Sequence, residues 1–264
     1  MKRSFRDSST CIAILLFTYN VYGQNVDFLK TIEHAKRSVL AVVCMGQNPD
    51  TKSLYLISVD GSGFFASDDG SFVTAGHVAK GLFALGRIPT CPVKAVYVPL
   101  NNWDTSKSDV DLRIIPIKRC WWNDNVDVGV CTLAVNPFLD DAIKLKPVVA
   151  DFDTSVQPDG TPVAFTGFPL SFIQPITSQG IVGTYRNATD VLGPKEMMVD
   201  KNAWPGASGS PVYLSNGKVV GLIVQRGFND ASGLAFARTS FFIKDFLAKN
   251  KADREAQEQK EKQR

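Results

Sequence analysis

The sequence is poor in the side chains from which most protein metal sites are built. Its 264 residues include two histidines and five scattered cysteines, and neither a CxxC nor an HExxH spacing occurs. Zinc sites usually draw three or four such ligands from closely spaced positions. We therefore expect no metal site in this protein.

A strong net charge is also lacking. The formal net charge is +3 at pH 7, and loss of residues 1–23 would lower it to +1. Proteins that bind nucleic acids or anionic membranes usually carry a marked basic excess. The charge balance therefore argues against nucleic acid or a membrane surface as the main partner.

Long hydrophobic runs are missing too, and the one prominent run lies at the N-terminus. Residues 11–19 are mostly apolar and follow the basic residues Lys2, Arg3 and Arg6. Val21 and Gly23 then suit the −3 and −1 positions of a cleavage site before Gln24. This order predicts a secretory signal peptide over 1–23, because the run is too short to span a bilayer or to form a typical core helix. We expect a periplasmic or secreted protein with no membrane span.

The remaining chain has the pattern of an all-β protein. From about 38 to 240, short apolar runs alternate with Gly, Pro, Asn and Asp, which is typical of a sandwich or barrel. Helical spacing predicts a short amphipathic helix over 26–37 and a terminal helix over 240–250. Residues 249–264 are charged, and we expect a solvated helix extension or a disordered tail.

Export changes the interpretation of the cysteines. Four remain after loss of the leader: Cys44, Cys91, Cys120 and Cys131. Residues 93–100 and 111–118 predict an antiparallel hairpin in which Leu100 faces Asp111. The same register, continued, brings Cys91 opposite Cys120, so we expect a disulfide between them. Cys44 and Cys131 lie in apolar runs that suit simple core thiols.

Ser208 is the candidate nucleophile. It lies in the segment PGASGSP at 205–211, where small residues surround a serine on a tight turn. Serine needs a base to remove its proton, and the attacked carbonyl needs fixed donors for its developing charge. The backbone freedom of Gly206 allows its amide and that of Ser208 to form such an oxyanion hole. Alone, this motif is only moderately specific.

His77 is the candidate base, because the sequence offers only one other histidine. His34 lies among basic residues on the predicted first helix, where a surface position is expected. His77 lies at the end of an apolar strand, in FVTAGHV at 72–78. A lone histidine there is usually structural, but imidazole titrates near neutral pH and can shuttle the Ser208 proton.

Asp127 is the candidate for the carboxylate that orients His77. It opens the apolar run DVGVCTL, and a carboxylate at the start of a buried strand needs a partner. Asp124 lies in a polar turn and is the weaker candidate. Asp111 suits a solvent-facing position in the hairpin.

Together these segments resemble the catalytic motifs of chymotrypsin-fold serine proteases. TAGHV (74–78), DVGV (127–130) and GASGSP (206–211) match in type and in the order His, Asp, Ser. Over roughly 26–248 the chain is most similar to the protease domain of the HtrA/DegP group. Further segments that carry the likeness are GSGFFASDDGSFVTAGHV (61–78), VAFTGFPLSFIQPITSQGIVG (163–183) and GKVVGLIVQ (217–225).

The resemblance implies two six-stranded antiparallel β-barrels with the site in the cleft between them. It assigns the protease domain to 24–248, with barrels at about 38–140 and 150–240. His77 and Asp127 would come from the first barrel and Ser208 from the second. HtrA proteases usually carry a PDZ domain after the protease domain; none follows in this sequence, so we expect no PDZ-controlled activation.

The resemblance also indicates a substrate pocket. The residues expected to bind the substrate are Asn202, Ala203, Ile223, Val224 and Gln225, and the strand around 222–225 would pair with the bound peptide. Glutamyl endopeptidases share the GSGSP form of the motif but place a histidine where Ile223 aligns, so glutamate specificity is not supported. An uncharged, small or medium apolar residue is expected before the scissile bond.

The function predicted from the sequence is an exported serine endopeptidase that needs no cofactor and acts on polypeptides through an acyl-enzyme. The alternative is a catalytically silent or latent protein of the same fold that binds peptides or acts like a chaperone. An intact triad argues against the silent form, because a pure binder needs none of the three groups.

Overall fold

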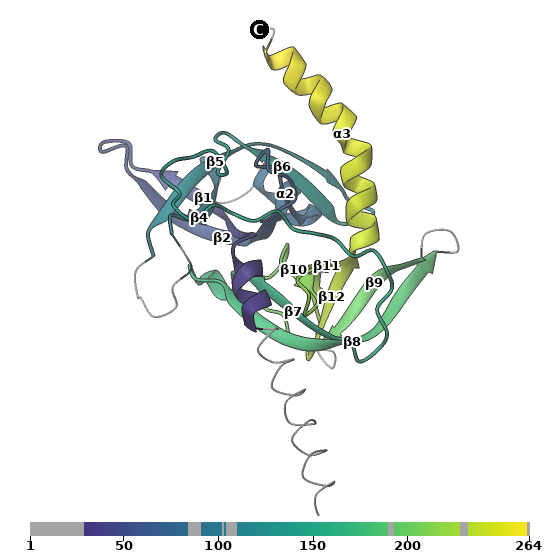
Figure 1. Ribbon diagram of the computed structural model, residues 1–264. Coiled ribbons are helices and arrows are strands. Elements are labelled where there is room, and N and C mark those ends of the chain that lie inside the picture. The colour runs from purple at the N-terminus through teal and green to yellow at the C-terminus, as the bar shows by residue number, and fades with distance from the viewer. Residues whose placement is uncertain are drawn as a thin grey trace, which may run out of the picture.

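The computed structural model describes residues 29–83, 91–101, 103, 110–189, 193–227 and 232–262. The predicted signal peptide and its cleavage site lie outside these ranges. The chain forms two β-barrels stacked on one another, with a long helix beside them (Figure 1).

The first barrel is a closed antiparallel ring in the order β1-β2-β3-β6-β5-β4. Its strands are rich in β-branched and aromatic residues, which favour extended backbone. Turn residues such as Asp68 to Gly70 separate them. The strands are β1 (Val39–Gln47), β2 (Leu54–Phe65), β3 (Phe72–Ala75), β4 (Val93–Pro99), β5 (Leu112–Asn123) and β6 (Val128–Leu133).

The second barrel closes in the order β10-β11-β12-β9-β8-β7. Read from β7, this ring repeats the strand connections of the first barrel. The predicted architecture of two six-stranded antiparallel barrels is thus confirmed. The strands are β7 (Pro162–Gly167), β8 (Ile176–Thr189), β9 (Gly193–Asp200), β10 (Pro211–Tyr213), β11 (Val219–Arg226) and β12 (Leu234–Thr239).

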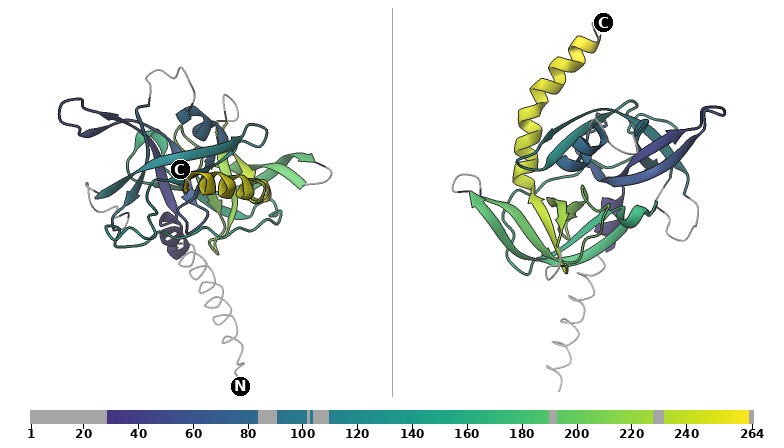
Figure 2. Two further views of the ribbon diagram at one scale, coloured as in Figure 1. Left: turned by 90° about the horizontal axis from the view of Figure 1, so that it is seen from above. Right: turned by 180° about the vertical axis from the view of Figure 1, so that it is seen from behind.

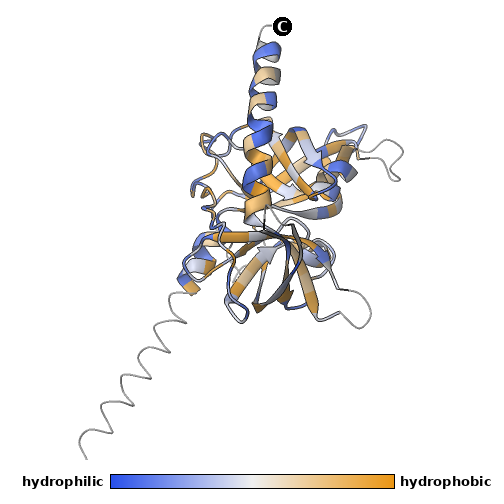
Figure 3. Ribbon diagram, turned by 90° about the vertical axis from the view of Figure 1, so that its right-hand side faces the viewer, coloured by the Kyte–Doolittle hydropathy of each residue, from blue (hydrophilic) through white to orange (hydrophobic). Residues whose placement is uncertain are grey.

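Helices lie at the ends of the barrels. Residues 29–36 are helical, as the apolar spacing predicted, and α2 (Gly76–Phe83) follows β3 directly. Helix α3 (Ser240–Lys262) leaves β12, runs beside the first barrel and projects beyond it (Figure 2). It is apolar near its start and mostly polar along the projecting part (Figure 3). Because the helix extends to Lys262, the charged residues from 249 onward continue the terminal helix. Within the described ranges, no helix is long and apolar enough to cross a membrane.

Two apolar clusters form the interior. The second barrel has its own core around Val163, Met197 and Ile223. The core of the first barrel continues across the junction to Phe168, Tyr213 and other residues of the second barrel, and to the start of α3. Because one cluster spans the junction, burial of apolar surface holds the barrels together.

The predicted disulfide between Cys91 and Cys120 is wrong. The structure joins Cys44 to Cys91 and Cys120 to Cys131, with Cα atoms 5.4 Å and 4.1 Å apart. The predicted hairpin register is correct, since Leu100 donates to the Asp111 carbonyl at 2.8 Å. The β4–β5 ladder ends at Pro116, however, and β5 then pairs with β6, where Cys120 and Cys131 are direct partners. Cys91 instead lies near the β1–β4 pair that holds Cys44.

Candidate active site

Strand pairing brings His77 and Asp127 together. Strands β3 and β6 are neighbours, and their last paired residues are Ala75 and Val128. His77 follows β3 and Asp127 precedes β6, so both lie at the same end of this pair. A Cβ atom on Gly76 would lie 3.0 Å from Asp127 Oδ1, which explains why glycine precedes the histidine.

The imidazole and the carboxylate are hydrogen-bonded. His77 Nδ1 lies 3.0 Å from Oδ2 and 3.1 Å from Oδ1 of Asp127, and the His77 amide donates to Oδ1 at 2.8 Å. Because an ionised carboxylate carries no proton, Nδ1 must donate, which leaves Nε2 as the acceptor in the neutral ring. Half of the His77 side chain is exposed. The pair therefore presents a fixed, accessible base.

The surroundings of Asp127 keep it ionised. Burial raises the pKa of its carboxyl group. Hydrogen bonds and electrostatic attraction from His77, together with the positive charge of Arg238, lower the pKa by a larger amount, so the net pKa lies below its ordinary value. Asp124, the weaker candidate, is exposed and pairs with Lys80 at 2.8 Å instead. Asp127 is thus the carboxylate next to His77.

Ser208 lies on a turn of the second barrel that begins at Gly206. The φ angle of Gly206 is +93°, in a region that other residues avoid. A Cβ atom there would lie 2.4 Å from the Phe168 carbonyl oxygen, so the turn packs directly on the segment at η1 (Pro169–Ser171). Leu170 donates to the Pro205 carbonyl at 2.7 Å and fastens this contact.

A serine of the first barrel holds the turn from the other side. The amide of Ser62, in β2, donates to the Ser208 carbonyl at 2.7 Å. Its hydroxyl donates to the Gly206 carbonyl at 2.8 Å and accepts from the Phe168 amide at 2.9 Å. Ser62 is fully buried. The turn that carries Ser208 is therefore shaped by contact with the first barrel.

Two amides of this turn differ from the rest in their hydrogen bonding. The amides of Ala207, Gly209 and Ser210 donate to carbonyls of Trp204, Ile223 and Ala207 respectively. Within the described ranges, the amides of Gly206 and Ser208 have no such acceptor. Both are available to an added oxygen atom, as an oxyanion hole requires.

Gly61 lies close both to the residue after His77 and to Ser208. A Cβ atom on Gly61 would lie 2.8 Å from the side chain of Val78, which follows His77, and 2.9 Å from the Ser208 carbonyl oxygen. Among the described residues, the Ser208 hydroxyl makes no hydrogen bond with the His77 ring. Catalytic hydrogen bonds of this kind often tighten only when substrate binds.

The predicted substrate-binding residues fall into two groups. Ala203, Ile223 and Val224 are buried, whereas Asn202 is half-buried and Gln225 is exposed. Past Ile223, β11 pairs only with β12 among the described strands, because the short strand β10 begins at Pro211, which pairs with Leu222. The backbone of 224–226 is therefore an open edge beside the Ser208 turn.

An apolar pocket of about 130 Å³ lies behind the turn. Its lining includes Asn202 and Ala207 of the turn and the side chains of Phe165, Leu170 and Trp204. Sequence reasoning named only Asn202 of these. The available signal was the tryptophan of NAW (202–204), directly before the PGASGSP segment, whereas FPLSF (168–172) is distant in the sequence.

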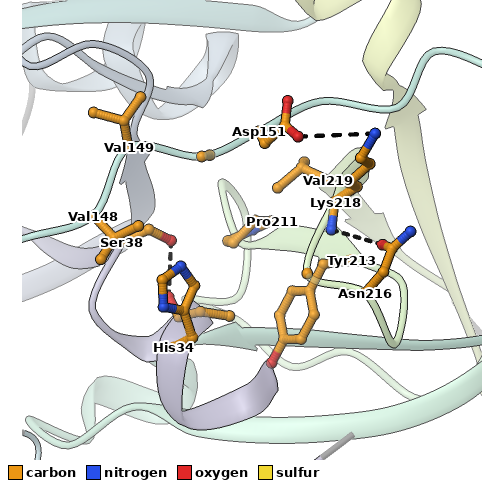
Figure 4. A pocket seen from close by; sticks show the side chains of 13 residues that line it. His34, Ser38, Val148, Val149, Asp151, Pro211, Tyr213, Asn216, Lys218 and Val219 are labelled. Carbon is orange, nitrogen blue, oxygen red and sulfur yellow. Dashed lines mark hydrogen bonds and ion pairs between the residues drawn. The ribbon is translucent and has the colours of Figure 1, made fainter. Parts of the chain in front are cut away.

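A second pocket, of about 140 Å³, lies at the N-terminal helix (Figure 4). His34, Asp151 and Lys218 stand around it, and the charged ends of the last two are 3.9 Å apart. His34 is exposed, as predicted, and is no part of the arrangement around Ser208. Within the described ranges, no cluster of three His, Cys, Asp or Glu side chains is placed to hold a metal ion.

Paired barrels with this ring order define the chymotrypsin-like fold, a fold of proteases. The family model of the trypsin-like peptidase domain matches residues 61–222, more than half of the chain, so the chain belongs to that family. Among solved structures, it is similar to the Rv3671c protease from M. tuberculosis in its active form. That likeness has a TM-score of 0.57 and 18% identity and covers 83% of this chain and 82% of the other, which supports the fold. No curated protein sequence matches the chain.

Proposed function

We propose that the protein is a serine endopeptidase in which Ser208 is the nucleophile, His77 the general base and Asp127 the group that orients His77. One observation carries the proposal. The His77 ring is hydrogen-bonded to an ionised carboxylate at 3.0 Å, at the junction where the Ser208 turn packs on the first barrel. Membership of the trypsin-like peptidase family supports the assignment as a protease.

The first half of the reaction forms an acyl-enzyme. Ser208 Oγ attacks the carbonyl carbon of the substrate while its proton passes to His77 Nε2. The amides of Gly206 and Ser208 donate to the oxyanion, and Asp127 stabilises the imidazolium. The bond from carbon to nitrogen then breaks, and His77 returns the proton to the leaving amine.

The second half repeats these steps with water. His77 Nε2 takes a proton from water, whose oxygen attacks the acyl carbon and regenerates the oxyanion. The bond between carbon and Ser208 Oγ breaks, and the hydroxyl recovers its proton from His77. The free carboxylic acid leaves. No cofactor takes part in this scheme.

We propose that the peptide pairs with the open edge of β11. Residues 224–226 pair with β12 on one side only among the described strands, which supports this assignment, since an extended peptide can add on the other side as a further strand. Asn202 and the buried residues Ala203 and Ile223 carry no charge. We therefore propose an uncharged, small or medium apolar residue before the scissile bond.

We also propose export to the periplasm or the medium. The leader-like residues 1–23 and the two disulfides of the first barrel support this location, because disulfides persist in oxidising compartments. N-terminal sequencing of the exported protein should begin at Gln24. A start at Met1 would contradict the assignment.

Covalent labelling tests the catalytic proposal. A sulfonyl fluoride or organophosphorus reagent should modify Ser208 stoichiometrically, as mass spectrometry of tryptic peptides would detect. Labelling should fall away in a His77→Ala variant, because the hydroxyl then lacks its base. Ser208→Ala should stay folded and lose roughly 10⁶-fold in kcat on peptide substrates.

The same experiment addresses the alternative of a silent or latent peptide-binding protein. A folded protein that no reagent labels, and that cleaves no peptide library, would favour the binder. Labelling that appears only after addition of peptide mixtures would indicate a latent protease. Labelling of a serine other than Ser208 would refute the nucleophile assignment.

A further inference from the structure

A buried arginine of the second barrel reaches the turn that carries Asp127. Arg238 lies in β12, and only 6% of its surface is exposed. Its Nε donates to the Val126 carbonyl at 2.5 Å, and its Nη1 donates to the Lys195 carbonyl at 3.1 Å. Burial of a charge is costly unless the group is paired and hydrogen-bonded. Such a position needs a physical reason.

Both barrels hold the turn at 123–127. From the first barrel, Lys80 of α2 pairs with Asp124. From the second barrel, Lys195 Nζ donates to the Asn125 carbonyl, and Arg238 donates to the next carbonyl, that of Val126. The two carbonyls that precede Asp127 are thus both bound by cations of the second barrel. Movement between the barrels would be transmitted to Asp127.

The charges around Arg238 alternate in sign. Glu196 is its direct partner in the β9–β12 pair, is buried, and pairs with Arg186 of β8. Burial lowers the pKa of Arg238, whereas the negative charges of Glu196 and Asp127 raise it. A guanidinium nevertheless stays protonated in proteins. Its positive charge therefore interacts with the negative charges of both Glu196 and Asp127.

We propose that Arg238 is a positioning residue for the candidate catalytic carboxylate. It fixes the backbone immediately before Asp127 through its hydrogen bond to the Val126 carbonyl, so that docking of the second barrel sets the orientation of Asp127 and, through it, of His77. Arginine suits this role better than lysine, because its planar fork reaches two carbonyls from two barrels at once.

This inference deepens the proposed function, on which its kinetic test rests. We expect Arg238→Gln to lower kcat roughly 10²-fold with KM unchanged, because a displacement of about 1 Å in a catalytic group costs about that much. Arg238→Lys should recover part of kcat, since an ammonium keeps the charge but not the fork. The matched control is Arg186→Gln, which removes another guanidinium of the same cluster, one that pairs with Glu196 and stacks on Phe236. It should keep the wild-type kcat.

Proton NMR can test the position of Asp127 relative to His77 without measuring catalysis. The proton shared by His77 Nδ1 and the Asp127 carboxylate should give a downfield resonance in the wild type. We expect Arg238→Gln to lose or broaden it and Arg186→Gln to keep it. If Ser208 proved not to be the nucleophile, this NMR result would still support the positioning role of Arg238. A failure of the proposed function can thus be distinguished from a failure of the Arg238 proposal.

The proposal would be overturned by a folded Arg238→Gln variant with an unchanged resonance, or by a loss of activity that lies in KM alone. If the glutamine variant does not fold, Arg238→Lys decides. A lowered kcat at constant KM supports the role, whereas a wild-type kcat overturns it.

Discussion

The two barrels share one strand order but support their halves of the candidate site differently. The first barrel contains both disulfides, and it presents His77 and Asp127 from the ends of two paired strands. All four cysteines beyond residue 23 take part in these two disulfides. The second barrel presents Ser208 on a turn that starts at a residue with positive φ. The proposed acid–base pair therefore lies at the ends of two strands of one barrel, whereas the proposed nucleophile lies on a loop of the other.

That loop takes part of its shape from the other barrel. Ser62 binds the carbonyls of both Gly206 and Ser208, and Arg238 crosses in the opposite direction to the turn before Asp127. Each barrel thus holds the catalytic segment of its partner. Assembly of the site and docking of the barrels are then one event, and substitutions can separate the contributions of the two sides.

Among substitutions that leave Ser208 in place, the largest effect is expected at the first-barrel half. Asp127→Asn should lower kcat about 10⁴-fold, because an amide that donates to His77 would favour the wrong tautomer. KM for peptides should change little. Steady-state kinetics with a peptide substrate would measure both values. Asp124→Asn is the matched control, since Asp124 pairs with Lys80 and not with His77; equal losses in the two variants would contradict the assignment of Asp127.

A smaller effect is expected at the second-barrel half. Gly206→Ala should lower kcat by roughly 10²- to 10³-fold, the usual cost of losing one oxyanion donor. The added methyl group would lie 2.4 Å from the Phe168 carbonyl and force the turn away. Gly160→Ala is the control, because Gly160 also has a positive φ, +83°, but open space around it. It should lose about 1 kcal/mol of stability and no activity.

The sequence predicted the parts of the site that depend on local pattern. The β4–β5 register followed from alternating strands and a polar turn, and the contact between His77 and Asp127 agrees with the prediction from the motifs around them. The motif around Ser208 likewise singles out that residue, whose role stays a prediction. The disulfides were mispredicted because the β4–β5 ladder stops at Pro116, so that Cys120 pairs with Cys131 across the next hairpin, β5–β6. Cys91 bonds Cys44 of β1, a strand that becomes a neighbour of β4 only when the barrel closes. Ser62 and Arg238 donate hydrogen bonds to carbonyls more than 100 residues away, and no local sequence pattern predicts those acceptors.

Removing the disulfides should separate stability from catalysis. Cys44→Ala with Cys91→Ala opens a crosslink of 47 residues, and Cys120→Ala with Cys131→Ala opens one of 11. On the loop-entropy model, these double variants should lose about 4 and about 3 kcal/mol of unfolding free energy. Urea titration would measure the losses. The folded variants should keep the wild-type kcat; a matching drop in kcat would mean that the crosslinks also tune the site.

The smallest effect concerns acid stability. The lowered pKa of Asp127 means that its ionised form stabilises the folded state above about pH 4, the ordinary value for an unfolded aspartate. This stabilisation is lost as the pH falls through the folded-state pKa. The difference in unfolding free energy between wild type and Asp127→Asn, measured by urea titration, should therefore be larger at pH 6 than at pH 3. Asp140 and Asp153 also have lowered pKa values, but they are present in both proteins and cancel in the difference. A gap that does not change with pH would show that the interactions of Asp127 with His77 and Arg238 add nothing to folding, and that they serve orientation alone.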